Sequence, residues 1–455
     1  MNSLKAGFAR VNVTPMMGIP INGYFLDRIS DGVLDELEIN ALALQAGGKK
    51  VILMSLDSCS IATYILNEYR DLISQATALP REAIYIHTTH SHTTPYADPK
   101  HPRLPKGTEG LVEEYKTFLS HRFVDVAKAA LADLKDARMG FAVGQSPNVA
   151  FVRRFRMKDG SIKTNPGVHN PDIVAPVGEV DERVNVLRFD REGADSIALL
   201  NVGNHPDTVG GCKISADWPG FARRSLEKAI DGVKCIFFNG AQGDINHVNV
   251  HPTQGDFNDM FVDFDDVSRG YGHARHMGRV VAAAAMQVWD KVNYTDVDSI
   301  RYANKTVNVP SNMPSPEDIP EAHKINDLHK AGRDSELPYE GMMLTTVVAE
   351  AERMVRLENG PEFFPMTFSA LSIGNVAFFG IPGEPFNAIG KGVKASQGWD
   401  LVIPSCLTNG SNGYFPMKDA YDEGGYEARS SNFKAGTAEL IIEQGLDILK
   451  SLRKE

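Results

Sequence analysis

Apolar and polar positions alternate along this chain in a pattern that predicts a layered α/β protein. Short runs rich in apolar and β-branched residues predict strands, and longer segments with apolar residues every three to four positions predict helices. The predicted strands are 51–56, 83–86, 197–202, 235–238 and 299–309, and the predicted helices are 111–134, 221–230, 270–289, 342–357 and 434–452. This order favours mixed sheets that are flanked by helices.

Three segments depart from the alternation. Residues 367–381 read as a β-hairpin, because Gly374-Asn375 is a turn pair. Residues 156–181 and 253–269 resemble long loops, which in compact proteins are often lids or binding loops. The second is expected to be a solvated surface turn, since its spacing does not match a calcium-binding EF-hand loop, although a second ion there stays an open question. It carries Asp256, Asp259, Asp263, Asp265 and Asp266.

Composition and charge narrow the class of protein. The 455 residues are 42% hydrophobic and 23% charged, which is typical of a globular enzyme. The 47 basic and 58 acidic residues give a net charge of -11, and no basic run is present, so nucleic acid is not expected as a partner. The four cysteines are scattered, which favours buried apolar positions over disulfides or thiolate metal sites.

The chain begins without an apolar signal segment and holds no run long enough to span a bilayer. We therefore expect no integral membrane segment and a cytoplasmic protein, or a secreted one if a leader has been removed. The expected partner is a small-molecule substrate. The oligomeric state stays open.

Two histidines follow the predicted strand 83–86, in the segment Thr88-Thr89-His90-Ser91-His92. Alternate residues of an extended chain face the same side, so His90 and His92 can reach one cavity together. Neutral imidazole suits a zinc-type ion, and the same pattern also fits a hydrogen-bonded structural pair. The segment by itself leaves both interpretations open.

Similar polar clusters follow two more predicted strands, 197–202 and 235–238. In open α/β sheets the ends of the strands are where ligands bind. The alternative is that such residues cap helices or hold turns, which is what we expect of Asp217. The clusters contribute His205, Asp207, Asp244, Asn246 and His247.

The C-terminal part adds a carboxylate and several phenols. Glu384, in Pro-Gly-Glu-Pro, lies at a predicted strand-to-helix junction, where it can cap the helix or bind a metal. The glycine-rich segment 408–414 ends at Tyr414 and is followed by Tyr421 and Tyr426. These tyrosines fit either aromatic packing or a binding site.

Taken in order, these motifs resemble the neutral and alkaline non-lysosomal ceramidases, which are zinc-dependent amidases. Residues 7–15, Gly-Phe-Ala-Arg-Val-Asn-Val-Thr-Pro, are similar to the opening of that family, and the likeness continues through each cluster. The resemblance implies the family's α/β catalytic-domain fold as a single zinc hydrolase domain over 1–455. It also implies that the family's C-terminal immunoglobulin-like domain has no counterpart here.

The resemblance further implies roles for individual residues. Zn²⁺ would be bound by His90, His205, Glu384 and Tyr414. His92 and Tyr426 would face the substrate carbonyl and stabilise its oxyanion, and Arg153, or less clearly its neighbour Arg154, would line the pocket. Two imidazoles, a carboxylate and a phenol-type oxygen suit zinc and leave room for a water.

The chain departs from the family at one important position. Ceramidases carry an essential serine in a Gly-Asp-x-Ser-Pro-Asn type of motif, whereas residues 243–248 have Asn246 in its place. A seryl intermediate cannot form there, which puts ceramidase activity itself in doubt and leaves attack by metal-bound water open. We expect Asn246 beside the metal, where it orients that water or the substrate. The candidates for a general base are Asp207, Asp244 and His247.

The leading interpretation is a zinc-dependent hydrolase that cleaves an amide, ester or lactone of a small, polar molecule. A competing one is a non-catalytic, metal-containing binding protein that lost catalysis together with the serine. An intact ligand set favours the enzyme. Purely structural histidines would require several separate coincidences of motif and order.

Overall fold

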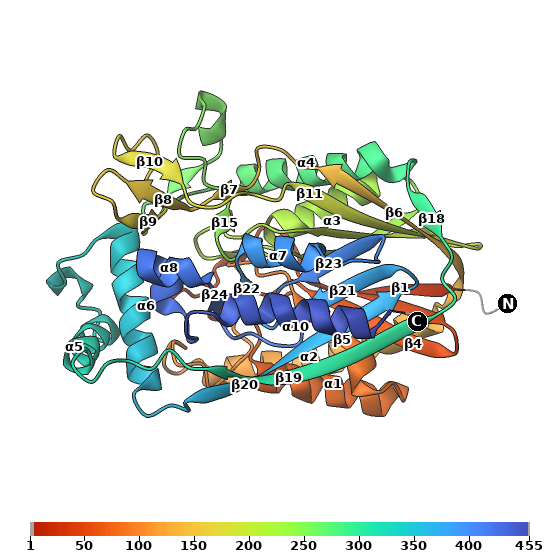
Figure 1. Cartoon of the computed structure of the whole chain (residues 1–455), viewed down its shortest axis with the longest axis horizontal. Helices are drawn as coiled ribbons and strands as arrows, with labels where there is room; N and C mark the ends of the chain where they lie inside the picture. Colours follow the sequence, from red (N-terminus) through yellow and green to blue (C-terminus); the bar gives the residue numbers. More distant parts are fainter. Residues whose placement is uncertain (1–3, 454–455) are drawn as a thin grey trace.

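The computed structural model describes residues 4–453 and contains two large β-sheets packed face to face (Figure 1). The first has nine strands in the order β14-β12-β11-β6-β1-β3-β4-β5, with β18 beside β6. Its strands are β1 (Lys5–Asn12), β3 (Glu38–Ala46), β4 (Lys49–Leu56), β5 (Ile84–Thr88), β6 (Lys135–Gln145), β11 (Arg183–Arg191), β12 (Ser196–Val202), β14 (Val233–Asn239) and β18 (Asn293–Thr295). The second sheet has the order β19-β20-β21-β23, formed by β19 (Ile300–Pro310), β20 (Phe363–Ile373), β21 (Val376–Gly380) and β23 (Leu401–Ser405).

The alternation of side chains along the strands explains the layers. Leu42 and Leu53 of the first sheet pack with Phe378 of the second. Their neighbours Ala41 and Ile52 point to the other face, which helices cover. The covering helices of the first sheet are α1 (Thr63–Thr77), α2 (Glu109–Ala132), α3 (Asp217–Ala229) and α4 (Tyr271–Trp289), and those of the second are α7 (Asn387–Lys394) and α10 (Thr437–Ser451). The predicted α/β fold of mixed sheets flanked by helices is confirmed.

Each predicted strand and helix coincides with an observed one, but the two predicted loops are more structured than expected. Residues 156–181 contribute to a small sheet, because Phe155, Met157 and Ile173 bury a local apolar cluster with Val250. Its strands are β8 (Arg154–Met157), β9 (Ile162–Thr164) and β10 (Ile173–Pro176). Residues 253–269 hold η2 (Gln254–Phe257), β16 (Phe261–Val262) and β17 (Ser268–Arg269).

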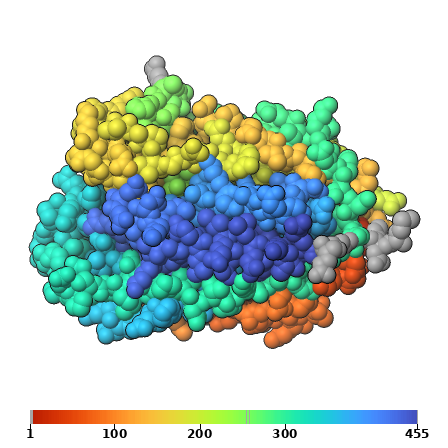
Figure 2. Space-filling view, viewed as in Figure 1, coloured from red at the N-terminus to blue at the C-terminus, as the bar shows by residue number. Residues whose placement is uncertain are grey.

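One end of the molecule is a separate helical layer. The helices α5 (Ile319–Lys330) and α6 (Gly341–Leu357) share an apolar cluster that also takes in Phe25 from the N-terminal part. Figure 2 shows this layer beside the β8–β10 sheet and the C-terminal segment. Helix α6 is fastened to the short helix α9 (Tyr426–Ser430), since Arg429 Nε donates to Glu350 at 2.8 Å. Within residues 4–453, no helix is both long enough and apolar enough to cross a membrane.

Three parallel strand pairs direct their carboxyl ends toward one region. They are β4 with β5, β12 with β14 and β21 with β23, and each pair is joined through a crossover that contains a helix. His90, His205 and Glu384 follow β5, β12 and β21 respectively. Short ladders tie the remaining loops together, formed by β2 (Gly32–Val33) with β13 (Lys213–Ile214), β7 (Phe151–Val152) with β15 (Ile245–Asn246), and β22 (Glu384–Pro385) with β24 (Tyr414–Phe415).

Candidate metal centre

Three buried side chains from three strand ends meet in one place. Nε2 of His90 lies 3.0 Å from Nε2 of His205 and 3.1 Å from Oε2 of Glu384. Nε2 of His205 lies 3.9 Å from the same carboxylate oxygen. Each of the three residues is less than a tenth exposed. This geometry is that of a group that can hold a metal ion.

The hydrogen bonds of the two imidazoles indicate which nitrogen carries the proton. Nδ1 of His90 lies 2.7 Å from the carbonyl oxygen of Cys59, and Nδ1 of His205 lies 3.3 Å from that of Gln242. A carbonyl only accepts, so each Nδ1 carries a proton and each Nε2 faces Glu384. With both rings neutral, the two Nε2 lone pairs would repel each other at 3.0 Å, so the group needs a positive charge, either a metal ion or a proton on His90. The donor set therefore fits a zinc-type ion.

The charges of the cluster agree with this assignment. Burial lowers the pKa of His90, but the Glu384 carboxylate outweighs burial and raises that pKa well above its usual value. Burial raises the pKa of Glu384, and His90 more than compensates, so the group stays ionised. Burial and the nearby Arg153 hold the pKa of His205 well below 6.5. Positive charge between a carboxylate and a neutral imidazole is thus favoured.

His90 owes its orientation to an unusual backbone conformation. Its φ of 76° lies in the left-handed region, which few residues other than glycine adopt and which often marks functional sites. The backbone N–H donates to the carbonyl of Ser58 at 2.8 Å, and the ring donates to Cys59. The Cys59 thiol, 3.9 Å from Nδ1 of His90, is buried as predicted, but it lies against the site and not in the apolar core.

Glu384 and Tyr414 are placed opposite each other by the β22–β24 ladder. The N–H of Glu384 donates to the carbonyl of Gly413 at 2.9 Å. Gly383 permits this approach, because a Cβ there would lie 2.7 Å from that carbonyl oxygen. The ring of Tyr414 lies nearly parallel to that of His205, with 6.4 Å between the centres. The tyrosine is therefore at the edge of the cluster.

Arg153, and not Arg154, reaches this edge. The Arg153 guanidinium lies 5.3 Å from the centre of the Tyr414 ring, and its Nε lies 2.6 Å from Oε1 of Glu427. Arg154 turns away to Glu423 and packs over an aromatic ring. Glu427 is fully buried and was not identified from the sequence, since an isolated glutamate in a short helix carries no pattern that predicts its partner.

His92 also points its Nε2 toward the cluster, 3.2 Å from Nε2 of His90. Its Nδ1 lies 3.5 Å from Oδ1 of Asp207. Burial lowers the pKa of His92 to about 3, so the ring is neutral. Nδ1 of His92 makes no hydrogen bond with the described residues, but the negative charge of Asp207 at 3.5 Å favours a proton on that nitrogen and leaves Nε2 as an acceptor.

A cavity of about 230 Å³ lies on the far side of Tyr426 from Tyr414, and the residues of the cluster do not line it. The Tyr426 ring contacts that of Tyr414 edge-on, with 5.5 Å between the centres, and it also lines the cavity. The volume is below the 300 Å³ or more that is typical of sites for drug-sized ligands. Polar and charged residues of the lining include Lys163, Asn165, Asp265, Asp266 and Arg429.

Three other candidates make their hydrogen bonds elsewhere. Asp244 Oδ1 accepts from the N–H of Asn387 at 2.7 Å, so Asp244, and not Glu384, holds the start of α7. Asn246 donates to Oδ1 of Asn165 at 2.9 Å and accepts from the N–H of Val248. Its carboxamide thus contacts the cavity wall instead of the ligand set. His247 Nε2 donates to the carbonyl of Ser268 at 2.6 Å.

The expectation of a solvated acidic turn is wrong for the second half of segment 253–269. Asp265 is buried and pairs with Arg269, and Asp263 lies 3.6 Å from the same guanidinium. The cation that these carboxylates surround is therefore an arginine of the chain. Asp217 meets the expectation of a turn-holding residue, since it accepts from the N–H groups of Thr208 and Val209.

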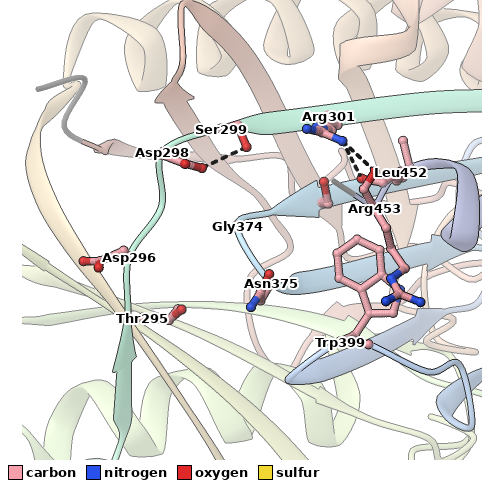
Figure 3. Close-up of a pocket in the computed structure, with 12 residues that line it drawn as sticks. Thr295, Asp296, Asp298, Ser299, Arg301, Gly374, Asn375, Trp399, Leu452 and Arg453 are labelled. Atoms are coloured by element: carbon pink, nitrogen blue, oxygen red, sulfur yellow. Dashed lines mark hydrogen bonds between the residues drawn. The ribbon is translucent and has the colours of Figure 1, made fainter. Parts of the chain in front are cut away.

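A larger hollow of about 480 Å³ is lined by a different set of residues (Figure 3). It is formed by the connection from β18 to β19, the β20–β21 turn and the end of α10. Histidine and cysteine do not occur in its lining. Its polar groups include Asp296, Asp298, Arg301, Asn375 and Arg453.

Comparison with protein-family models gives no match, and comparison with curated protein sequences gives none either. Among solved structures, the chain is similar to the neutral ceramidase from Pseudomonas aeruginosa, with a TM-score of 0.72 and 15% identity. It is equally similar to a ceramidase complexed with C2, with a TM-score of 0.72 and 16% identity. Each match covers 100% of this chain and 76% of the other. The chain therefore has a ceramidase-like fold.

Proposed function

We propose that this protein is a metal-dependent hydrolase that cleaves an amide, ester or lactone bond of a small, polar substrate. The observation that carries the proposal is the convergence of two imidazole lone pairs and a carboxylate, all buried, at His90, His205 and Glu384. A backbone carbonyl holds each Nδ1 and leaves the two Nε2 atoms facing one carboxylate, as in metal-binding imidazoles. The ceramidase-like fold agrees with hydrolysis of a carbonyl compound.

Zinc is the proposed ion, and Tyr414 is the proposed fourth ligand. The two imidazoles and the carboxylate are usual zinc ligands, and Tyr414 lies opposite Glu384 in the β22–β24 ladder. When bound, zinc supplies Lewis acidity for the attack of water on a carbonyl. Arg153 lies against Tyr414 and would hold its phenol in place.

The remaining polar groups divide into acceptors and donors. His92, with Asp207 opposite Nδ1, presents Nε2 as an acceptor for a hydrogen bond from the attacking water. After it has taken up a proton, the same nitrogen can donate to the oxyanion that forms on the carbonyl. The phenol of Tyr426 is a donor for that oxyanion from the cavity side. Asp207 orients His92 and is not itself the base.

We propose that a polar end of the substrate occupies the 230 Å³ cavity and that its reacting carbonyl lies on the other side of the Tyr426 ring, toward Tyr414. Its lining includes Lys163, Asp265, Asp266 and Arg429, and these charged groups favour a polar substrate. Asn165 lines this cavity and accepts a hydrogen bond from Asn246, and we propose that Asn246 thereby orients Asn165 toward a polar group of the substrate. Direct attack by water, without a covalent acyl intermediate, follows from the asparagine at position 246.

Zinc analysis of the protein purified without added metal, together with a screen of chromogenic amides, esters and lactones, tests this proposal. We expect about one zinc per chain and hydrolysis of a short polar substrate that stops on chelation and returns with zinc. One zinc per chain without turnover across the panel would support the alternative of a metal-containing binding protein. An absence of any bound metal would contradict both.

A further inference from the structure

Arg269 lies at the centre of a buried charge cluster that joins the acidic segment to the metal centre. The residue is 1% exposed. Its guanidinium makes two bonds to Asp265, Nη1 to Oδ1 at 2.7 Å and Nη2 to Oδ2 at 2.9 Å. It makes two more to Asp207, Nε to Oδ1 at 3.1 Å and Nη2 to Oδ2 at 2.9 Å. One arginine thus binds a carboxylate of the acidic segment and one of the catalytic region.

Both oxygens of the Asp207 carboxylate accept hydrogen bonds from groups other than His92. Besides Arg269, its Oδ1 accepts from the phenol of Tyr24 at 2.6 Å. The same oxygen faces Nδ1 of His92 at 3.5 Å. Gly23, which has a φ of 113°, keeps the neighbouring backbone close, since a Cβ there would lie 2.9 Å from the His92 ring. The position of the carboxylate relative to the ring is therefore set by Tyr24 and Arg269.

Asp265 holds the Arg269 guanidinium in the position from which it binds Asp207. Bidentate arginine–carboxylate pairs are strong and directional, and a buried charge that loses its partner is costly. If Asp265 were neutral, Arg269 would keep only Asp207 as a close bidentate partner, with Asp263 3.6 Å away. The guanidinium would then move toward Asp263, and Asp207 would move with it. The geometry at His92 would loosen as a result.

The acidic segment also forms part of the substrate cavity, because Asp265 and Asp266 line it. The same few residues therefore contact the cavity on one side and Arg269 on the other. Phe264 packs on Tyr24 with 5.0 Å between the ring centres, which adds a second contact between the segment and the Asp207 region.

We propose that Asp265 and Arg269 are positioning residues that hold Asp207 against His92 and so fix the tautomer of that histidine. The proposal rests on the proposed function, in which His92 acts on the reacting water. It assigns to the acidic segment a role in catalysis instead of calcium binding or solvation. Neither residue is required to touch the substrate.

The test compares Asp265→Asn with a matched control, Asp259→Asn, in the full chain. Asp259 is an exposed carboxylate of the same segment, 3.8 Å from Arg275. For Asp265→Asn we expect kcat to fall about 10- to 100-fold, the usual cost of losing an outer partner of a site, with KM changed less than threefold and zinc content unchanged. Asp259→Asn should match the wild type. A rise in KM at constant kcat would overturn the proposal, since Asp265 would then be a substrate contact.

A second measurement does not depend on activity. The ¹⁵N shifts of the His92 ring, assigned by comparison with His92→Gln, report which nitrogen carries the proton. We expect the Nδ1–H form in the wild type and in Asp259→Asn, and a mixture of forms in Asp265→Asn. Arg269→Lys keeps the charge but loses the two bidentate pairs and should behave like Asp265→Asn, so it serves if Asp265→Asn does not fold. Wild-type shifts in both variants would contradict the proposal even if hydrolysis is established.

Discussion

Two of the cavities in the described part of the chain differ in more than their volume. The hollow of Figure 3 is about 480 Å³, and the cavity beside Tyr426 is about 230 Å³. Polar groups of the hollow make local hydrogen bonds within turns and at the end of a helix. Asp298 accepts from Ser299, and Arg301 donates to the carbonyl of Arg453, just after α10. The smaller cavity is lined by Tyr426, whose ring packs on Tyr414 at the edge of a cluster of buried groups that converge on each other. Convergence and burial, more than size, indicate chemistry.

The largest effect should come from the metal ligands. Replacement of both His90 and His205 by alanine removes two of the ligands and should abolish stoichiometric zinc and lower turnover by more than about 1,000-fold. Zinc is measured by elemental analysis of the purified protein. A doubly substituted protein that still holds a full equivalent of zinc would show that the site has been misplaced.

The donors and acceptors around the reacting carbonyl should have the next largest effect. For His92→Ala and Tyr426→Phe we expect kcat to fall about 100- to 1,000-fold with little change in KM, because the charge that these groups stabilise develops only in the transition state. Zinc content must be measured in parallel, since His92 is two residues from a proposed ligand. Full zinc with near-normal kcat would disprove the assigned roles and leave Arg153 as the group that orients the carbonyl.

A buried histidine close to the site, His87, is expected to stabilise the fold without binding metal. His87, in β5, donates from Nδ1 to the carbonyl of Cys406 at 2.8 Å and accepts at Nε2 from the N–H of Asn239 at 2.9 Å. Both nitrogens are thus satisfied within the protein. His87→Gln should cost about 2 kcal/mol of stability through a lost buried hydrogen bond, without loss of zinc.

The same residue gives the protein a defined dependence of stability on pH. Burial lowers the pKa of folded His87 to about 3, against 6.5 in the unfolded chain. The unfolded chain therefore binds the proton first, and the stabilisation that is present above pH 6.5 is lost as the pH falls toward 3. Urea titrations at several pH values should show a shallower decline for His87→Gln than for the wild type. Equal declines would mean that His87 is not the titrating group.

The smallest effect is expected in the hollow. Asp296→Asn and Arg453→Ala remove an acidic and a basic group of its lining, and both should leave zinc content unchanged and kcat within about twofold, since surface substitutions usually have small effects. Steady-state kinetics on the best substrate of the panel measure this. A tenfold loss of turnover in either variant would move the functional site, or part of it, to the hollow.

Much of the candidate site follows from the sequence. His90, His205 and Glu384 each come directly after an apolar strand, and such positions are where α/β sheets present ligands. The sequence resemblance to ceramidases implies the same three residues as metal ligands. Asp244 and His247 also meet this criterion. However, Asp244 accepts from the N–H of Asn387 at the start of α7, and His247 donates to the carbonyl of Ser268 in β17. A pattern that places a residue at a strand end does not say which way the side chain turns.

What the sequence determined by itself is the set of layers and the location of the polar clusters. Residues such as Ala41 and Leu42 fall on opposite faces because successive side chains of a strand alternate, and this periodicity is local. The tertiary structure decided the partners: His90 meets His205 across 115 residues, Arg153 finds Glu427, and Arg269 joins Asp207 to Asp265. A buried charge is stable only beside a compensating one, and which one it finds depends on how distant segments pack, which no local pattern contains.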